Sequence, residues 1–252
     1  MKEFADAYAF GTLDIDGEEF PKVLFGTSPF MGAGQFGAKS YLYYRQFHEN
    51  PKNIVEIIIE CVKLGCNAVQ AICCPPILTA IKEAVRATDT QLFIMGSTGL
   101  GEISNEIERM KQLNAQSIVT HGSYTDRILS KNPEKLKRTL QGIKDGIVGI
   151  ASHTPGTIIE KAAVIEEVKL MLIPFNKIGV FMDPSFESTV HAAESARRMG
   201  KKIIAMKSLA AGRLEPAVAF QFLKDRVDGV AVGLTNMEEI KETLEAASSY
   251  FR

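Results

Sequence analysis

Residues 147–175 read IVGIASHTPGTIIEKAAVIEEVKLMLIPF and contain two short apolar runs, Ile147–Ser152 and Leu170–Phe175, joined by a segment with helical spacing of apolar residues. A strand, a helix and a second strand in this order form a unit whose two strands lie parallel. Both runs are continuously apolar, as in strands that are buried on both faces of a sheet. The stretch therefore predicts a parallel sheet covered by helices.

The same unit recurs along the chain. Six further apolar runs alternate with helical segments and bring the number of predicted strands to eight: Val23–Thr27, Ala68–Cys73, Leu92–Ser97, Ser117–His121, Ile203–Ser208 and Val230–Leu234. Eight such units in a chain of 252 residues predict an α/β fold, a (β/α)8 TIM barrel. An open doubly wound sheet is the alternative, and it would need fewer strands and a topological switch.

Two of the predicted helices have a clear apolar face. In the first, Ile54, Ile57, Ile58, Cys61 and Val62 share one side. In the last, Met237, Ile240, Leu244 and Ala247 do so. Residues at this spacing on a helix face the core, so we expect all of them to be buried.

Two segments lie outside the repeating units. Phe10–Phe20 reads as a β-hairpin with Asp16-Gly17 as its turn, and we expect it to close the lower end of the barrel. Ser28–Pro51 is the longest connection, and it holds Tyr41, Tyr43 and Tyr44. Long loops in compact domains are usually functional, so this segment is a candidate lid, whose tyrosines either cover a ligand or pack the loop down.

The composition is that of a globular chain, and we expect a single domain over residues 1–252. Apolar residues make up 46% of the chain, and 29 basic residues balance 30 acidic ones. This balance argues against nucleic-acid or anionic-membrane partners and favours a small-molecule ligand. No apolar stretch approaches the ~18 residues of a membrane span, and Met1–Tyr8 lacks the apolar run of a signal peptide. We therefore expect a cytoplasmic protein; its oligomeric state is left open.

Four cysteines, Cys61, Cys66, Cys73 and Cys74, lack the paired spacing of a zinc site, and we expect reduced thiols. Cys73 and Cys74 follow a predicted strand, where a nucleophile could be exposed. Cysteine is also frequently a buried apolar residue, and we favour that interpretation.

Several stretches resemble the aldo/keto reductases. Lys202–Leu214, KIIAMKSLAAGRL, resembles their seventh strand and loop, and Val232–Asn236, VGLTN, their eighth strand and the start of the phosphate-binding helix. Upstream, Val148–His153 and Ile173–Asn176 resemble their fifth and sixth strands. The resemblance implies a TIM barrel with an opening hairpin, and an oxidoreductase that uses a nicotinamide cofactor.

The sequence departs from this family at its catalytic positions. The family places an aspartate, a tyrosine, a lysine and a histidine around the substrate carbonyl. Here Val69-Gln70-Ala71, Cys73–Pro76 and Met95-Gly96-Ser97 stand where the first three are expected, and only His121 matches the histidine. Without a tyrosine activated by a lysine the usual proton donor is missing. We therefore expect an atypical mechanism rather than conventional carbonyl reduction.

The resemblance also places a cofactor corner at the last two strand ends. Gly233 and Glu239 stand where the family's basic clamp for a 2′-phosphate is expected, which weakens the case for NADP and leaves binding of NAD(P) open. A glycine-containing loop and a helix start still suit a phosphate or another anion. The candidate binding residues are Ser152, Ser208, Gly212, Arg213, Gly233, Leu234, Thr235 and Asn236. Asn236 is equally well interpreted as a helix N-cap.

Gly32–Gly37 matches G-x-G-x-x-G, but it lies inside a long loop. A dinucleotide fingerprint follows a strand directly and opens a helix, so we interpret this match as fortuitous.

His121, His153 and Lys207 are the candidate catalytic residues because they stand at carboxyl ends of strands, which face one shared site in a barrel. His121 would polarise the substrate or donate a proton. Lys207 would hold negative charge together with Arg213, or form a Schiff base.

Two other functional classes stay open. His121, His153 and Asp183 could hold a divalent metal in a hydrolase or lyase, although Asp183 could instead cap a helix. A non-catalytic ligand-binding barrel is the third hypothesis.

Overall fold

The computed structural model describes residues 7–143 and 146–252, and its centre is a closed barrel of eight parallel strands. The ring runs in the order β10-β3-β4-β5-β6-β7-β8-β9, which excludes the open doubly wound alternative. The strands are β3 (Val23–Gly26), β4 (Ala68–Ile72), β5 (Phe93–Thr98), β6 (Ser117–Thr120), β7 (Ile147–Ala151), β8 (Leu170–Pro174), β9 (Lys202–Met206) and β10 (Gly229–Gly233). Each corresponds to a predicted strand, and the bounds differ by one or two residues.

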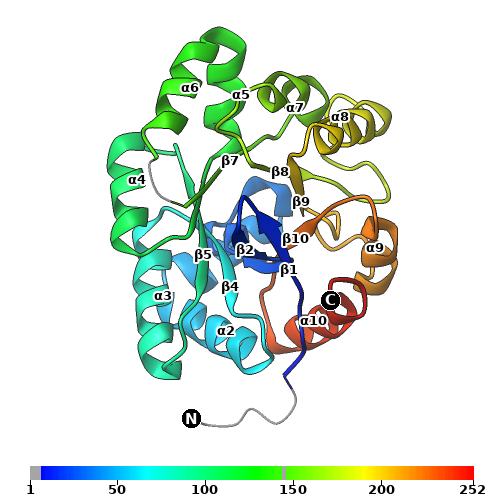
Figure 1. Cartoon of the computed structure of the whole chain (residues 1–252). Helices are drawn as coiled ribbons and strands as arrows, with labels where there is room; N and C mark the ends of the chain where they lie inside the picture. The colour runs from blue at the N-terminus through cyan, green and yellow to red at the C-terminus, as the bar shows by residue number, and fades with distance from the viewer. Residues whose placement is uncertain (1–6, 144–145) are drawn as a thin grey trace.

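Helices surround the barrel, as Figure 1 shows. They are α2 (Pro51–Lys63), α3 (Pro75–Thr88), α4 (Ile103–Gln112), α5 (Gly122–Lys131), α6 (Pro133–Gln141), α7 (Pro155–Ala163), α8 (Phe186–Arg198), α9 (Pro216–Leu223) and α10 (Met237–Tyr250). The predicted apolar face of α2 is buried throughout. On α10 the prediction was wrong for Met237, which is 41% exposed, because it is the first residue of the helix and lies before the stretch that packs on the barrel.

An N-terminal hairpin closes the amino end of the barrel, as predicted. Strands β1 (Thr12–Ile15) and β2 (Glu18–Pro21) pair antiparallel across the Asp16-Gly17 turn, and both turn residues have positive φ, 56° and 88°. Such a turn matches the right-handed twist of the two strands. Ile15 and Phe20 join the core inside the barrel, and the hairpin lies in front of the barrel centre in Figure 1.

The segment between β3 and α2 is folded rather than irregular. It contains two 3-10 turns, η1 (Ser28–Met31) and η2 (Gly34–Phe36), then α1 (Lys39–Tyr43) and a π-helical turn, η3 (Tyr44–His48). The buried rings of Phe30 and Phe47 lie 4.8 Å apart and anchor it to the barrel. Gly32–Gly37 therefore belongs to turns within this segment and opens no long helix, as interpreted from the sequence.

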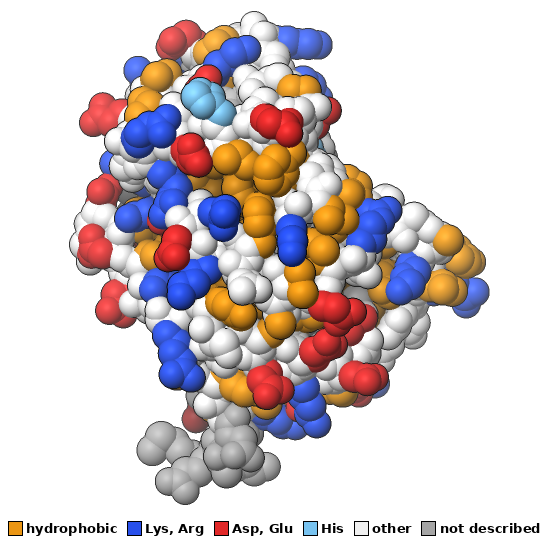
Figure 2. Space-filling view, turned by 90° about the vertical axis from the view of Figure 1, so that its right-hand side faces the viewer, with side chains coloured by type: hydrophobic (Ala, Val, Ile, Leu, Met, Phe, Trp, Pro, Cys, Tyr) orange, Lys and Arg blue, Asp and Glu red, His pale blue; other side chains and the backbone are white. Residues whose placement is uncertain are grey.

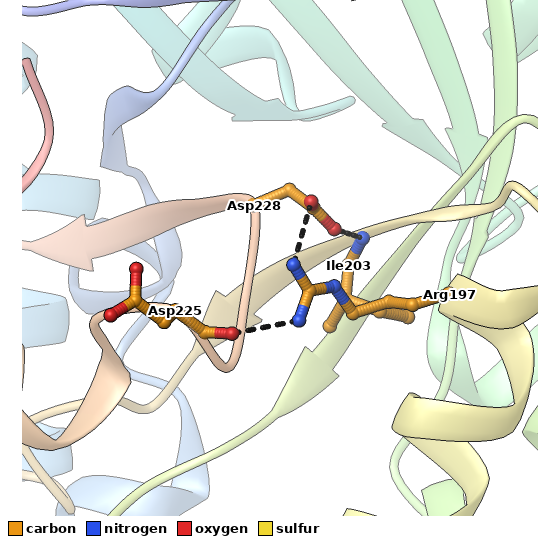
Figure 3. A network of polar contacts seen from close by, with 4 residues as sticks. All are labelled: Arg197, Ile203, Asp225 and Asp228. Atoms are coloured by element: carbon orange, nitrogen blue, oxygen red, sulfur yellow. Dashed lines mark hydrogen bonds and ion pairs between the residues drawn. The ribbon is translucent and has the colours of Figure 1, made fainter.

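A polar network ties three elements together at the amino ends of the last strands (Figure 3). Arg197 of α8 donates to the Asp225 carbonyl at 2.8 Å and approaches the Asp228 carboxylate at 3.3 Å. The same carboxylate accepts from the Ile203 amide of β9 at 2.7 Å. Asp228 directly precedes β10, so the network fixes the start of two neighbouring strands.

The outer surface carries both basic and acidic side chains. On the side formed by α8, α9 and α10, basic and acidic side chains are interspersed with small apolar groups (Figure 2). Among the helices of the described residues, none is long and apolar enough to cross a membrane. The first six residues, on which the expectation about a signal peptide partly depends, lie outside the described residues.

The hairpin plug should contribute strongly to stability. Phe20 is fully buried and packs edge-on against Phe93, with ring centroids 5.1 Å apart. We expect Phe20→Ala to lower the free energy of unfolding by about 3–5 kcal/mol in urea denaturation, because it opens a cavity in a closed core. Val164→Ala is the control: Val164 is 71% exposed, and its truncation should change stability by less than about 0.5 kcal/mol. Equal effects of the two changes would contradict a role for the hairpin as a plug.

Candidate functional site

A cavity of about 690 Å³ opens at the carboxyl ends of the barrel strands. His121, His153 and Lys207, which follow β6, β7 and β9, all line it. The structure thus brings together the three candidate catalytic residues, as the barrel rule predicts. Their chemical roles stay predictions.

The two histidines that line the cavity are in contact with each other. Their rings meet edge to face with centroids 5.2 Å apart. His121 is the N-cap of α5, and its Nδ1 accepts from the Ser123 amide at 3.2 Å. A neutral imidazole whose Nδ1 accepts carries its proton on Nε2, so His121 offers a hydrogen-bond donor. Gly122 permits the close packing, because a Cβ there would lie 2.8 Å from His153 Cδ2.

Asp126 holds the loop that carries His153. One carboxylate oxygen accepts from the Ser152 hydroxyl at 2.7 Å, and the other accepts from the His153 amide at 2.9 Å. The Ser152 hydroxyl in turn accepts from the Thr154 amide at 3.1 Å. Ser152 is fully buried and is bonded to Asp126, so its hydroxyl positions the loop; we had expected it to line the ligand site.

Sequence reasoning missed Asp126. Asp126 lies in the second turn of the helix that His121 caps. A carboxylate so close in the chain to a candidate catalytic histidine was the sequence feature that could have identified it.

Lys207 lies between an imidazole and an aromatic ring. Its Nζ is 3.5 Å from His153 Nδ1 and 4.8 Å from the centroid of Phe181. The guanidinium of Arg213 approaches the same ring at 5.8 Å. Within the described part of the chain, neither cation forms an ion pair with a carboxylate. Phe181, which the sequence analysis did not single out, lines the cavity and lies near both cations.

Burial lowers the pKa of His121, His153 and Lys207 and so increases the neutral fraction of each side chain. Desolvation, followed by the charges of Lys207 and His121, lowers the pKa of His153 to about 4. Desolvation also lowers the pKa of His121, with Lys207 adding to the effect and Glu106 opposing it. The pKa of Lys207 is lowered by desolvation, against the attraction of Asp126. Both imidazoles are therefore neutral at pH 7, which suits hydrogen bonding to a carbonyl group and proton transfer.

In the predicted phosphate-binding region, several hydrogen-bond donors already have acceptors within the same region. The amides of Gly212 and Arg213 both donate to the Leu209 carbonyl. The amide and hydroxyl of Thr235 donate to the Glu239 carboxylate at 3.0 and 2.6 Å. The amides of Gly212, Arg213 and Thr235 thus have partners within the chain.

The helix start at this corner is also occupied. The Asn236 side chain accepts from the Glu239 amide at 2.9 Å, which makes Asn236 the N-cap of α10, one of the two roles left open for it. Glu215, Glu239 and Glu242 line this end of the cavity. Gly233, Leu234 and Thr235 line it as well, and the carboxylates make this end acidic.

The alternative metal set is not assembled. Asp183 is exposed and does not line the cavity that His121 and His153 share. Across residues 7–143 and 146–252, no group of three His, Cys, Asp or Glu side chains could hold a metal ion. The prediction was wrong because the chain after β8 carries Asp183 away from the rim. Nor does Asp183 cap α8; Ser185 does so through a capping box.

Cys73 and Cys74 are buried, which confirms the interpretation as apolar residues, and all four cysteines are free thiols. Burial raises the pKa of Cys73 to about 11, so its thiolate is scarce.

The segment over the cavity contributes Phe36, Lys39 and Tyr43 to its wall. Tyr43 both faces the cavity and packs on Phe36, with ring centroids 5.2 Å apart. Tyr44 stacks on His48, and Tyr41 is 65% exposed. Gln70 lines the floor at the position where the resemblance places an aspartate.

No family model matches the chain, and no curated protein sequence matches it. Several solved structures match the chain in fold. A protein from Pseudomonas aeruginosa described as an aldo-keto reductase has 17% identity and a TM-score of 0.70, with both chains covered completely. An aldo-keto reductase from Bacillus halodurans in its holo form has 11% identity and a TM-score of 0.61 over 95% of this chain and 91% of that one.

A glycerol dehydrogenase from Gluconobacter oxydans has 13% identity and a TM-score of 0.62 over 93% of this chain and 89% of its own. At such identities the likeness is one of architecture. The hairpin-plugged (β/α)8 barrel of this chain is the fold of the aldo-keto reductases.

Proposed function

We propose that the cavity binds a small anionic or phosphorylated metabolite, and that the protein acts on a carbonyl or hydroxyl group of that metabolite as an oxidoreductase of atypical mechanism. The observation that carries this proposal is the ammonium group of Lys207, which lies 4.8 Å from the centroid of Phe181 and has no carboxylate partner among the described residues. Lys207 lines the cavity and is half-buried, and the exposed Arg213 adds a second positive charge near the same ring. A cation that is partly withdrawn from water and has no partner is unfavourable, and a bound anion would relieve this.

The polar side chains near Lys207 support the same proposal. Ser208 is one of the residues that line the cavity and is only 1% exposed, and its hydroxyl has no hydrogen-bond partner among the described residues. Buried hydroxyls normally have one. Because the amides of Gly212 and Arg213 are already bonded, side chains rather than backbone donors would hold the anion.

Neutral histidines support action on a carbonyl group. The Nε2–H of His121 would donate to the carbonyl oxygen, and would stabilise negative charge that develops there. A neutral imidazole is a weaker acid than an imidazolium, so this role is mainly one of polarisation.

NAD(H) and NADP(H) would fit the cavity differently. The acidic end of the cavity, with Glu239 bonded to Thr235, does not fit the 2′-phosphate of NADP(H), since like charges would meet. Ribose hydroxyls are compatible with carboxylates, so NAD(H) fits this end better. When bound, such a nucleotide would supply or accept a hydride.

Anion binding can be tested directly. We expect pyruvate, glyoxylate or glycerol 3-phosphate to bind in calorimetric titrations, and each of Lys207→Met and Arg213→Gln to weaken binding by about tenfold, because each removes a charge-assisted contact. Lys177→Gln, which changes an exposed lysine outside the cavity, should leave affinity unchanged. Failure of all three probes to bind the wild-type protein would refute the proposal.

The cofactor specificity can be tested with the same method. We expect NADH to bind more tightly than NADPH, and Glu239→Gln to reduce the difference, since the carboxylate opposes the extra phosphate. NADPH oxidation across simple aldehydes should be negligible. Rapid NADPH turnover would show that a conventional reductase mechanism operates despite the missing tyrosine.

The neutral state of His153 predicts its titration. By nitrogen-detected NMR, His153 should titrate near pH 4, well below the ordinary value for histidine, as burial and Lys207 both disfavour its charge. Lys207→Met should move this pKa upward, because Lys207 is one of the charges that lower it. A His153 pKa above 6 in the wild type would contradict the described environment.

A further inference from the structure

Lys207 has the surroundings of a nucleophilic amine. Its neighbours are a neutral imidazole and the face of an aromatic ring, and in the described residues no carboxylate lies within ion-pair distance of it. A surface lysine is kept charged by water, whereas an amine in a cavity of this kind has a larger neutral fraction. Only the neutral amine carries the electron pair that attacks a carbonyl carbon.

The backbone presents this amine to the cavity. Lys207 directly follows β9 and has a φ of 55°, a conformation that costs a residue with a Cβ about 1 kcal/mol or more. The Asn176 side-chain amide donates to the Lys207 carbonyl at 3.3 Å and helps to hold this turn. A strained residue fixed by its neighbours, with its side chain in a cavity, is typical of functional positions.

We propose that Lys207 forms an imine with the carbonyl carbon of a small anionic aldehyde or 2-oxo acid bound in the cavity, and that His153 transfers the protons of this step. The inference rests on the proposed function, because it uses the same cavity and the same class of ligand. It adds a covalent step that hydride chemistry does not require.

The step is balanced when it starts from the ammonium form of Lys207. His153 Nδ1, 3.5 Å from Nζ, first accepts one proton from the ammonium group. The Nζ electron pair then forms a bond to the carbonyl carbon while the C=O π bond breaks, and a second proton moves from nitrogen to oxygen to give a carbinolamine. His153 returns the first proton to the hydroxyl group, which leaves as water, and a protonated C=N bond remains.

The surrounding groups fit both the reactant and the product. His121 Nε2–H can polarise the carbonyl before attack, and the buried Ser208 hydroxyl next to Lys207 has no hydrogen-bond partner among the described residues. The protonated imine keeps a positive charge at Nζ, so the anionic group of the ligand retains its partner. The Phe181 face accommodates this cation as it does the ammonium group.

Reductive trapping tests the proposal. The full-length protein is incubated with glyoxylate or pyruvate and sodium cyanoborohydride, and the modified peptide is located by mass spectrometry. We expect one stable adduct, at Lys207, which forms before any adduct at Lys39, the exposed lysine of the same cavity. Adducts spread evenly over surface lysines, or no adduct at all, would overturn the inference.

Matched variants separate the imine from simple anion binding. Lys207→Arg keeps the charge, so it should still bind the probes in calorimetry but form no adduct. His153→Gln should keep Lys207 reactive but slow adduct formation by about tenfold or more, because the proton carrier is lost. Lys177→Arg should trap like the wild type. Circular dichroism spectra that match the wild type would confirm that each variant is folded.

The outcomes distinguish the two proposals. Binding of both probes without trapping at Lys207 overturns the imine and leaves the anion site standing. Absence of binding and of trapping overturns both. An unchanged trapping rate in His153→Gln overturns the assignment of the proton carrier.

Discussion

Closure of the strand ring is the constraint on which everything else depends. Strand β10 pairs with β3 in register from Val230 and Val23 to Gly233 and Gly26, which joins the end of the chain to its beginning. Parallel strands in a closed ring point their carboxyl ends to one rim. Residues far apart in the chain therefore line one cavity, such as His121 and Lys207, which are 86 positions apart.

The two ends of the barrel have different tasks. At the amino end, the hairpin fills the interior with Phe20, and the Arg197–Asp228 network fixes the starts of β9 and β10. The hairpin core is buried, and the polar groups of the network are paired with one another. At the carboxyl end, Lys207 is held at positive φ, and the Ser208 hydroxyl has no partner among the described residues. Positive φ also occurs at the amino end, at Asp16 and Asp225, so what distinguishes the carboxyl end is a strained residue and an unpaired hydroxyl side by side at a cavity.

The cavity wall carries charges of both signs. Lys207 lines it beside Phe181, and Glu215, Glu239 and Glu242 line it as well. The overall charge of the chain, near zero, does not reveal these local charges. A ligand that fills the cavity would have its anionic group at the lysine and neutral or hydroxyl-bearing groups near the glutamates, because charge complementarity governs specificity.

The sequence by itself determined the barrel, the hairpin and the positions of the rim residues. Continuous apolar runs report burial on both faces, and Asp16-Gly17 reports a tight turn, so local patterns suffice for these features. The convergence of His121, His153 and Lys207 followed from the barrel alone.

Only the tertiary structure decided which side chains meet. It pairs Asp126 with Ser152, brings Phe181 near two cations, bonds Glu239 to Thr235 and leaves Asp183 outside the cavity that the histidines line. Each of these depends on the direction of a side chain after a loop. Apolar periodicity carries no information about such directions, because the residues in contact come from different units of the fold.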